Sequence, residues 1–289
     1  MTVADRLDEL THTFEKDRAY CESLFASQNA EAAAELLVSH QWANSAFVIC
    51  QKLLCGQAAS HFGQDGHDKG ERGALWALVL SESMHRDMRL VAYLAFRGLV
   101  WESAVLLRRA FEHAGVLMHL WRDPRKLDAF EDPRGKQYTA AFRREADHRI
   151  AELPKEEGSS KRFAAMTAGQ SATVLYDRLS EFLVHGRTPT RIAFMSLDPG
   201  PASCTFAFRG DPRDTRVGQE LELLRQGHQL LCCEIVCLCL NYCPQIDEFV
   251  EAARILPSLS QTGPTRTPEM AAAVNHLLRL FREGSSGVA

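Results

Sequence analysis

The chain has 289 residues and a formal net charge of -4 at pH 7, with 46% hydrophobic and 24% charged residues. This length suffices for one large domain or two modest ones with a sizeable core, and the composition is ordinary for a globular protein. The slightly negative charge excludes a uniformly basic nucleic-acid-binding protein, so any contact with RNA or DNA must be local.

The N-terminal sequence MTVADRLDELTHTFEKD is polar where a secretory signal would be apolar, so we expect no signal peptide. The longest apolar segments contain Arg or Glu, which predicts no transmembrane helix and no membrane partner. Nine cysteines, an odd number without a secretion signal, indicate free thiols in a reducing compartment. We therefore expect a cytoplasmic protein.

The first third of the chain predicts two helices and a loop. Val3–Phe25 has the pattern of a charged amphipathic helix, and Asn29 is a suitable N-cap for a second helix that reaches Phe62. The glycine-rich, charged segment Gly63–Gly73 predicts an exposed loop. Its acidic side chains and histidine match no EF-hand or zinc spacing, so we interpret them as solvated.

The stretch Met88–Trp121 is mostly apolar and contains no proline, which predicts a buried helix, or two helices with a break near Gly98. A preceding helix begins at Ala74, and Asp123 with Pro124 ends the run. We expect the other helices to wrap around this central element.

Five ionisable residues in this apolar stretch are candidates for an interior polar network or a binding site: Arg97, Glu102, Arg109, Glu112 and His113. Charged groups are rarely buried unless they are paired. Glu102 and Arg109 are two helical turns apart, and Arg109 and Glu112 are three residues apart, so the spacing predicts ion pairs among them.

The second half predicts further helices and one hairpin. RIAFMSLD and ASCTFAFRGD have β character and are joined by Pro-Gly-Pro. The expected helices comprise a short piece at 125–131, then 136–153, 161–168, 173–186, a long one from Thr215 to Ile255, and a last one after a Pro/Thr linker at 257–268. The predicted class is all-α, an elaborated multi-helix bundle with at most one small β-hairpin near residues 191–209. We expect a single helical domain over 1–256 with its core at about 75–190, and a linker, a C-terminal helix and a flexible tail over 257–289.

Two motifs in the second half are candidate sites. The first is a cysteine cluster. Its members lie around a helix and do not converge on one point, which favours core packing over zinc binding: Cys232, Cys233, Cys237, Cys239 and Cys243.

The second motif is the pair Arg178 and His185, which are seven residues apart and share a helix face. A histidine can move the proton of a ribose 2′-hydroxyl, and an arginine can stabilise the charge that develops on the phosphate. A surface arginine and a helix-end histidine are the structural alternative. Arg108 and His113, about 140° apart, are a weaker match.

Two strings together resemble a family of uncharacterised bacterial all-helical proteins: RGLVWESAVLLRRAFEHAGVLMHLW and, later, YDRLSEFLVHG. The resemblance covers roughly residues 75–190. A remoter resemblance is to the HEPN superfamily, helical bundles that often dimerise and include metal-independent RNases of toxin–antitoxin and phage-defence systems with an Arg-x(4–6)-His motif. Arg178 and His185 match that spacing. The resemblance therefore implies a homodimer that acts on RNA with these two residues catalytic.

Three functions remain open from the sequence. The favoured hypothesis is a non-enzymatic module of a bacterial defence or stress system that binds a partner protein or a small ligand. The alternative is a HEPN-like endoribonuclease that uses Arg178 and His185. The third is an enzyme with a metal held by Glu102, Glu112 and His113, which lacks the usual Glu-x-x-His spacing. We assign no metal and no cofactor, since no phosphate-binding loop, HExxH or GxSxG motif is present.

Overall fold

A computed structural model describes residues 15, 18–64, 67–132, 175–177, 179, 195–197, 204–206 and 211–242. Its elements are α2 (Ala30–Gly63), α3 (His67–Ala95), α4 (Val100–Arg122), the 3-10 turn η1 (Pro124–Lys126), α5 (Leu127–Glu131), β1 (Met195–Leu197), β2 (Cys204–Phe206) and α9 (Thr215–Tyr242). Residues 18–26 are also helical. The predicted all-α class is confirmed.

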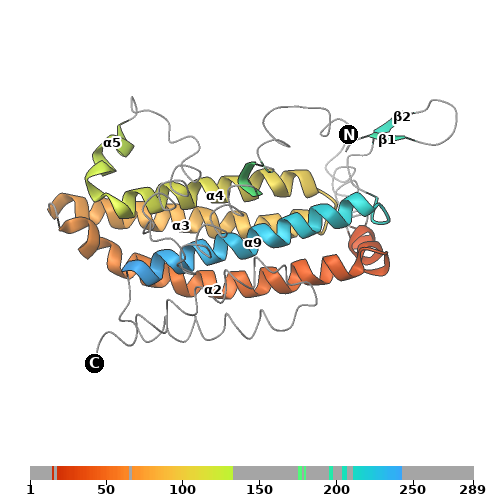
Figure 1. The fold of residues 1–289 in the computed structure, drawn as a ribbon, viewed down its shortest axis with the longest axis horizontal. Helices are drawn as coiled ribbons and strands as arrows, with labels where there is room; N and C mark the ends of the chain where they lie inside the picture. The colour runs from red at the N-terminus through yellow and green to blue at the C-terminus, as the bar shows by residue number, and fades with distance from the viewer. Residues whose placement is uncertain are drawn as a thin grey trace, which may run out of the picture.

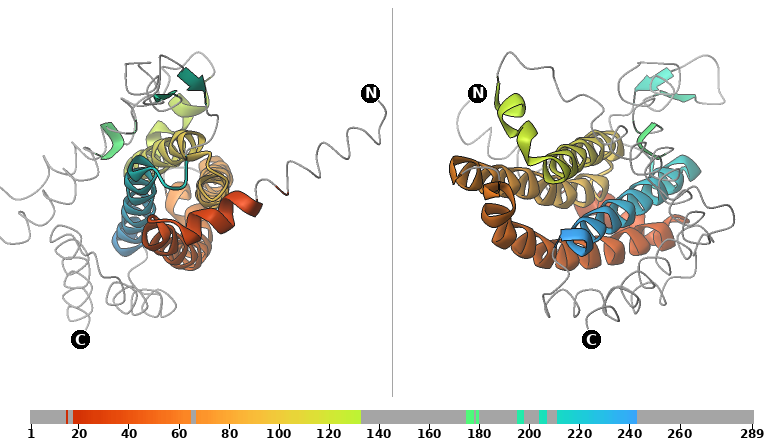
Figure 2. Two further views of the ribbon diagram at one scale, coloured as in Figure 1. Left: turned by 90° about the vertical axis from the view of Figure 1, so that its right-hand side faces the viewer. Right: turned by 60° about the vertical axis from the view of Figure 1, so that its left-hand side comes forward.

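The four long helices form a ring in which α2 packs on α3, α3 on α4, α4 on α9, and α9 on α2 (Figures 1 and 2). Successive helices α2, α3 and α4 alternate in direction, whereas α9 runs parallel to both of its neighbours (Figure 1). The apolar faces meet inside the ring, where Phe47, Leu107, Phe111 and Trp121 are fully buried. The central stretch predicted from the sequence, Met88–Trp121, therefore forms the end of α3 and most of α4, two adjacent walls of the bundle, and is not an axis that other helices wrap around.

The predicted break near Gly98 is present. Helix α3 ends at Ala95 and α4 begins at Val100. Gly98 has φ of +80°, a conformation that side chains disfavour. A Cβ atom there would also lie 2.7 Å from Cζ of Tyr20. Both the backbone and the packing therefore require glycine at this turn.

The predicted loop over Gly63–Gly73 is wrong for most of its length. Helix α3 begins at His67, so Gly70 and Gly73 lie inside it. A Cβ on Gly73 would come within 2.1 Å of Cγ of Phe62. These glycines therefore serve the close approach of α2 and α3 rather than a turn, and glycine content alone does not separate the two cases.

The two strands form the small hairpin that was predicted near residues 191–209, with Met195 opposite Phe206 in antiparallel register. The predicted helices at 136–153 and 161–168, the helix continuation beyond Tyr242 and the whole of 257–289 lie outside the described residues. Most of the predicted Val3–Phe25 helix also lies outside them.

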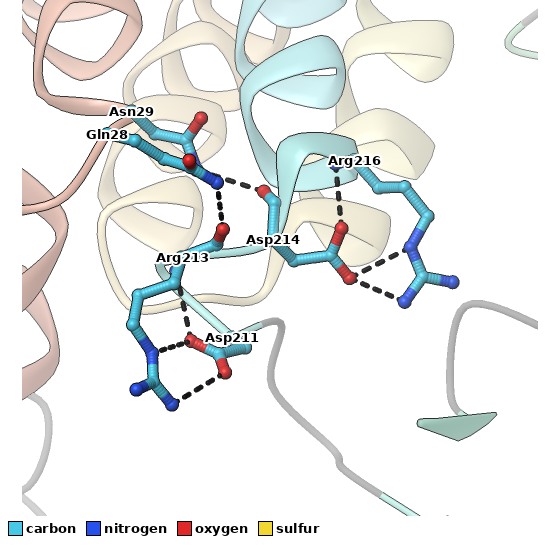
Figure 3. A network of polar contacts seen from close by, with 6 residues as sticks. All are labelled: Gln28, Asn29, Asp211, Arg213, Asp214 and Arg216. Carbon is cyan, nitrogen blue, oxygen red and sulfur yellow. Dashed lines mark hydrogen bonds and ion pairs between the residues drawn. The ribbon is translucent and has the colours of Figure 1, made fainter. Parts of the chain in front are cut away.

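Asn29 precedes α2, but its side chain does not cap that helix. It donates instead to the carbonyl of Asp214 at 2.9 Å (Figure 3) and to that of Pro212 at 2.7 Å, just before α9. Asp214 caps α9, because its Oδ1 accepts from the backbone N–H of Arg216 at 2.9 Å. A Cβ on Gly218 would lie 2.4 Å from Oδ1 of Asn29. The starts of α2 and α9 are therefore tied together.

Candidate binding site

A hollow of about 710 Å³ opens between α2 and α3. Helix α2 contributes two lining residues, α3 contributes eight, and Phe96 directly follows α3. The lining residues, which define the α2–α3 hollow, are Leu37, His40, Glu82, Ser83, His85, Arg86, Arg89, Leu90, Ala92, Tyr93 and Phe96. This combination of basic, imidazole and apolar side chains is typical of a site that binds an amphipathic anion.

The cationic side of the hollow is formed by Arg86 and Arg89, both exposed on α3. Arg86 lies next to Asp87, with its Nε 3.7 Å from Oδ1 of that carboxylate. Asp87 is fully buried and is already bound by Arg109. The guanidinium groups of Arg86 and Arg89 are therefore placed to bind a carboxylate or phosphate from outside.

The apolar side is formed mainly by Leu37, Leu90, Tyr93 and Phe96. Leu37 and Leu90 are each 36% exposed and Tyr93 is 48% exposed. The Arg97 guanidinium lies 3.8 Å from the centroid of the Tyr93 ring and fixes its orientation. The predicted candidate Arg97 thus lies beside the hollow and is not one of its lining residues.

His40 is a lining residue that is neutral at pH 7. Its pKa is lowered to about 4, first by burial and then by the nearby His228, Arg89 and His85. The rings of His40 and His228 meet edge to face at 5.5 Å. Within the described part of the chain, the buried Nδ1 of His40 has no hydrogen-bond partner. His40 therefore contributes an uncharged imidazole to the lining of the hollow.

His85 is held in place by α2. Its Nε2 lies 2.6 Å from Oδ1 of Asn44, which makes it the donor, and its ring stacks on Phe47 at 5.5 Å. Burial lowers the pKa of His85, so this ring too is mainly neutral at pH 7. His40 and His85 therefore contribute uncharged rings to the hollow, whereas Glu82, bonded to Gln51 of α2, contributes a carboxylate.

The predicted pairing within α4 is not the one that the structure shows for Arg109. Arg109 Nε donates to Oδ2 of Asp87 at 2.6 Å, and its Nη2 donates to the other oxygen. This two-pronged contact joins α4 to α3. Spacing along one helix missed Asp87 because the partner lies on the neighbouring helix, while Glu102 is exposed.

Glu112 contacts the segment that precedes Arg178. The Tyr176 hydroxyl donates to Oε1 of Glu112, and the Arg108 guanidinium lies 5.6 Å from the centroid of the Tyr176 ring. Leu175, Tyr176 and Leu179 are buried. Tyr176 and Leu179, which belong to the sequence string YDRLSEFLVHG, therefore help to pack this segment against α4.

His113, another of the predicted site residues, has a partly buried imidazole ring. Burial lowers its pKa, and its Nδ1 is buried with no hydrogen-bond partner among the described residues. It does not line the hollow. Arg178 and His185 lie outside the described residues, so the proposed catalytic pair stays a prediction.

Two cysteines of the predicted cluster pack as expected. Cys232 and Cys239 are buried free thiols, and Sγ of Cys239 donates to the carbonyl of Cys50 at 3.6 Å. In the part of the chain that the structure describes, no three His, Cys, Asp or Glu side chains are grouped so as to hold a metal ion.

Four main residues of the hollow were not predicted from the sequence: His40, His85, Arg86 and Arg89. A signal was present, because Glu82, Arg86, Arg89 and Tyr93 recur at intervals of three and four residues on one helix face. His40 had no comparable signal, because its role depends on packing against α3 and α9.

None of the described helices is both long and apolar enough to cross a bilayer. Comparison with known proteins gave no matching family model, no matching curated protein and no matching solved structure. The residues of the hollow are therefore the basis for assigning a function.

Proposed function

We propose that this protein is a non-enzymatic helical module that binds a small organic anion with an apolar body in the α2–α3 hollow. One observation carries the proposal: Arg86 and Arg89 stand beside an exposed apolar surface formed by Leu37, Leu90 and Tyr93. Arginine binds carboxylates and phosphates through paired N–H groups, and the apolar surface would cover the rest of the molecule.

The neutral histidines support the same assignment. A protonated His40 would be costly at its buried position, as its lowered pKa indicates. The hollow would thus place fixed positive charge only on the arginines and offer an uncharged imidazole from α2. Because the positive charge and the uncharged group come from different helices that line the hollow, a ligand that is charged at one end only would bind in one orientation.

A binding role is favoured over catalysis because the predicted polar residues serve helix contacts. Arg109 joins α4 to Asp87, and Glu112 holds Tyr176. None of Arg97, Glu102, Arg109, Glu112 and His113 lines the hollow. The setting in a bacterial defence or stress system is supported only by the family resemblance.

The test is isothermal titration calorimetry with octanoate and phenyl phosphate, each compared with a neutral alcohol, octanol or benzyl alcohol. We expect at least one anion to bind and its alcohol to bind more weakly. Arg89→Gln should weaken binding by about tenfold or more, which corresponds to the loss of one charge-assisted contact.

Arg213→Gln is the matched control, because Arg213 is an exposed arginine that pairs with Asp211 and is not one of the residues that line the hollow. Absence of binding by both anions, or equal affinity of the wild type and Arg89→Gln, would overturn the proposal.

A further inference from the structure

Eight exposed residues form a continuous line on the outer face of α3. This α3 stripe consists of Leu75, Leu78, Val79, Glu82, Arg86, Arg89, Leu90 and Tyr93. At 100° per residue all eight fall within about 60° of one line along the helix. Its apolar members are substantially exposed: Leu75 58%, Leu78 45%, Val79 42%, Leu90 36% and Tyr93 48%. An apolar line of this extent on a folded chain marks an interaction surface.

The stripe is complementary to itself when two copies run antiparallel. With the two-fold axis at the level of Met84, Glu82 of each copy faces Arg86 of the other, because the two positions are equidistant from that axis. The same operation brings Leu75 against Tyr93 and, along one edge of the stripe, Val79 beside Leu90. A parallel arrangement would instead place Glu82 on Glu82 and Arg86 on Arg86, which repel.

The two charged residues are available for such a contact. Glu82 accepts one hydrogen bond, from Nε2 of Gln51 at 2.7 Å, through its Oε1. Among the described residues, the ion pair of Arg86 is with Asp87, at 3.7 Å, and that carboxylate already has a two-pronged partner in Arg109. Both groups can therefore form a reciprocal ion pair between copies, which leaves Arg89 as the arginine that binds an anion in the hollow of the dimer.

We propose that a second copy of this chain binds antiparallel along the α3 stripe and forms a two-fold symmetric dimer. Leu75, Leu78 and Val79 of one copy then lie over Arg89, Leu90 and Tyr93 of the other. Since those three residues line the α2–α3 hollow, each copy covers the open side of its partner's hollow. This covering role rests on the proposed function, whereas the dimer itself does not.

The dimer is tested without ligand, by sedimentation velocity of the full chain across a range of concentrations. We expect the wild type to be a dimer and Leu78→Asp to be a monomer. Val105→Asp is the matched control, because Val105 is 49% exposed but lies on α4, away from the stripe. It should remain a dimer. A monomeric wild type, or Leu78→Asp dimers as stable as those of Val105→Asp, would overturn the proposal.

A charge exchange tests the register. Glu82→Arg and Arg86→Glu should each weaken dimerisation by about tenfold or more, because each places like charges opposite each other at two symmetric points. The double variant restores opposite charges and should recover most of the lost affinity. Circular dichroism verifies that each variant is folded. A double variant that dimerises no better than the singles would contradict the antiparallel register.

The anion-binding function and the dimer can be disproved independently of each other. A wild-type dimer that binds neither octanoate nor phenyl phosphate leaves the dimer standing and overturns the binding function. Anion binding that is equally tight in the wild type and in monomeric Leu78→Asp upholds the binding function and overturns the covering of the hollow by the second copy.

Discussion

The inner and outer faces of α3 use charge in opposite ways. On the inner face, the fully buried Asp87 is bound by both prongs of Arg109, and the carbonyl of Met88 lies 2.9 Å from Nε2 of His228 on α9. On the outer face, Glu82 and Arg86 are exposed and lie among exposed Leu and Tyr side chains. One helix thus carries a charge that joins the bundle together and charges that remain available to a partner.

This difference predicts which substitutions change folding and which change association. An inner charge that loses its partner is stranded away from water, with a penalty of several kcal/mol. An outer charge stays hydrated whether or not it is paired, so its loss alters stability little. The experiments below test this contrast in order of expected effect.

Arg109→Leu should produce the largest loss of stability. It leaves the Asp87 carboxylate buried without its guanidinium, which we expect to lower the free energy of unfolding by about 3 kcal/mol. Urea denaturation at fixed protein concentration measures the change. Arg213→Ala, which removes an exposed pair with Asp211, is the control and should change stability by less than about 1 kcal/mol. Equal effects of the two substitutions would contradict the structural role of Arg109.

Acid should destabilise the bundle through His40. Its folded-state pKa of about 4 lies below the unfolded value of 6.5, so the unfolded chain takes up the proton first. Stability is therefore complete above about pH 6.5 and is lost as the pH falls towards 4. Uptake of one proton on unfolding changes the free energy of unfolding by at most about 1.4 kcal/mol per pH unit. Partial solvation of the His40 ring makes the change smaller.

Urea midpoints measured between pH 7.5 and pH 4 for the wild type and for His40→Gln test this dependence. The variant should lose less stability on acidification, although His85, His113 and His228 also have lowered pKa values and will leave part of the slope. A slope that is unchanged in His40→Gln would contradict the assignment to His40.

Ser103→Ala should have a smaller effect on the inner face. The buried Ser103 hydroxyl on α4 is 2.9 Å from the carbonyl of Val91 on α3. Removing this contact should lower the free energy of unfolding by about 1 kcal/mol. The thermal midpoint measures the change, and Ser60→Ala, at an exposed position of α2, is the control.

Glu82→Gln and Arg86→Gln should have the smallest effect on folding, within about 0.5 kcal/mol when measured at a concentration where the chain is monomeric. Their effect should appear instead as a weaker dimer in sedimentation. If either substitution destabilises the monomer as strongly as Arg109→Leu does, the contrast between the two faces of α3 is wrong.

The sequence predicted those parts of the fold that depend on local patterns. The helical class follows from apolar periodicity, the break at Gly98 from a glycine between two apolar segments, and the hairpin from β character around a Pro-Gly-Pro turn. Gly73 was misinterpreted because the reason for that glycine is the Phe62 ring on another helix. Local spacing holds no information about such a partner.

The site was predicted less well for the same physical reason. Arg109 stood out because a charge in an apolar stretch needs a counter-charge, but the spacing on α4 suggested Glu112 and the partner is Asp87 on α3. His40 owes its lowered pKa to burial and to residues on α3 and α9. Which residues of different helices meet is decided by how the helices pack, and one sequence does not specify that packing.

The parallel course of α9 has a consequence for the order of folding. Helices α2, α3 and α4 follow one another through short connections, whereas α9 begins at Thr215, far along the chain from the end of α4 at Arg122. Closing so long a span slows the formation of contacts more than it weakens them. The antiparallel trio should therefore assemble first, and α9 should dock last between α2 and α4. In native-state hydrogen exchange, the amides of α9 should open at a lower free energy than those of α3.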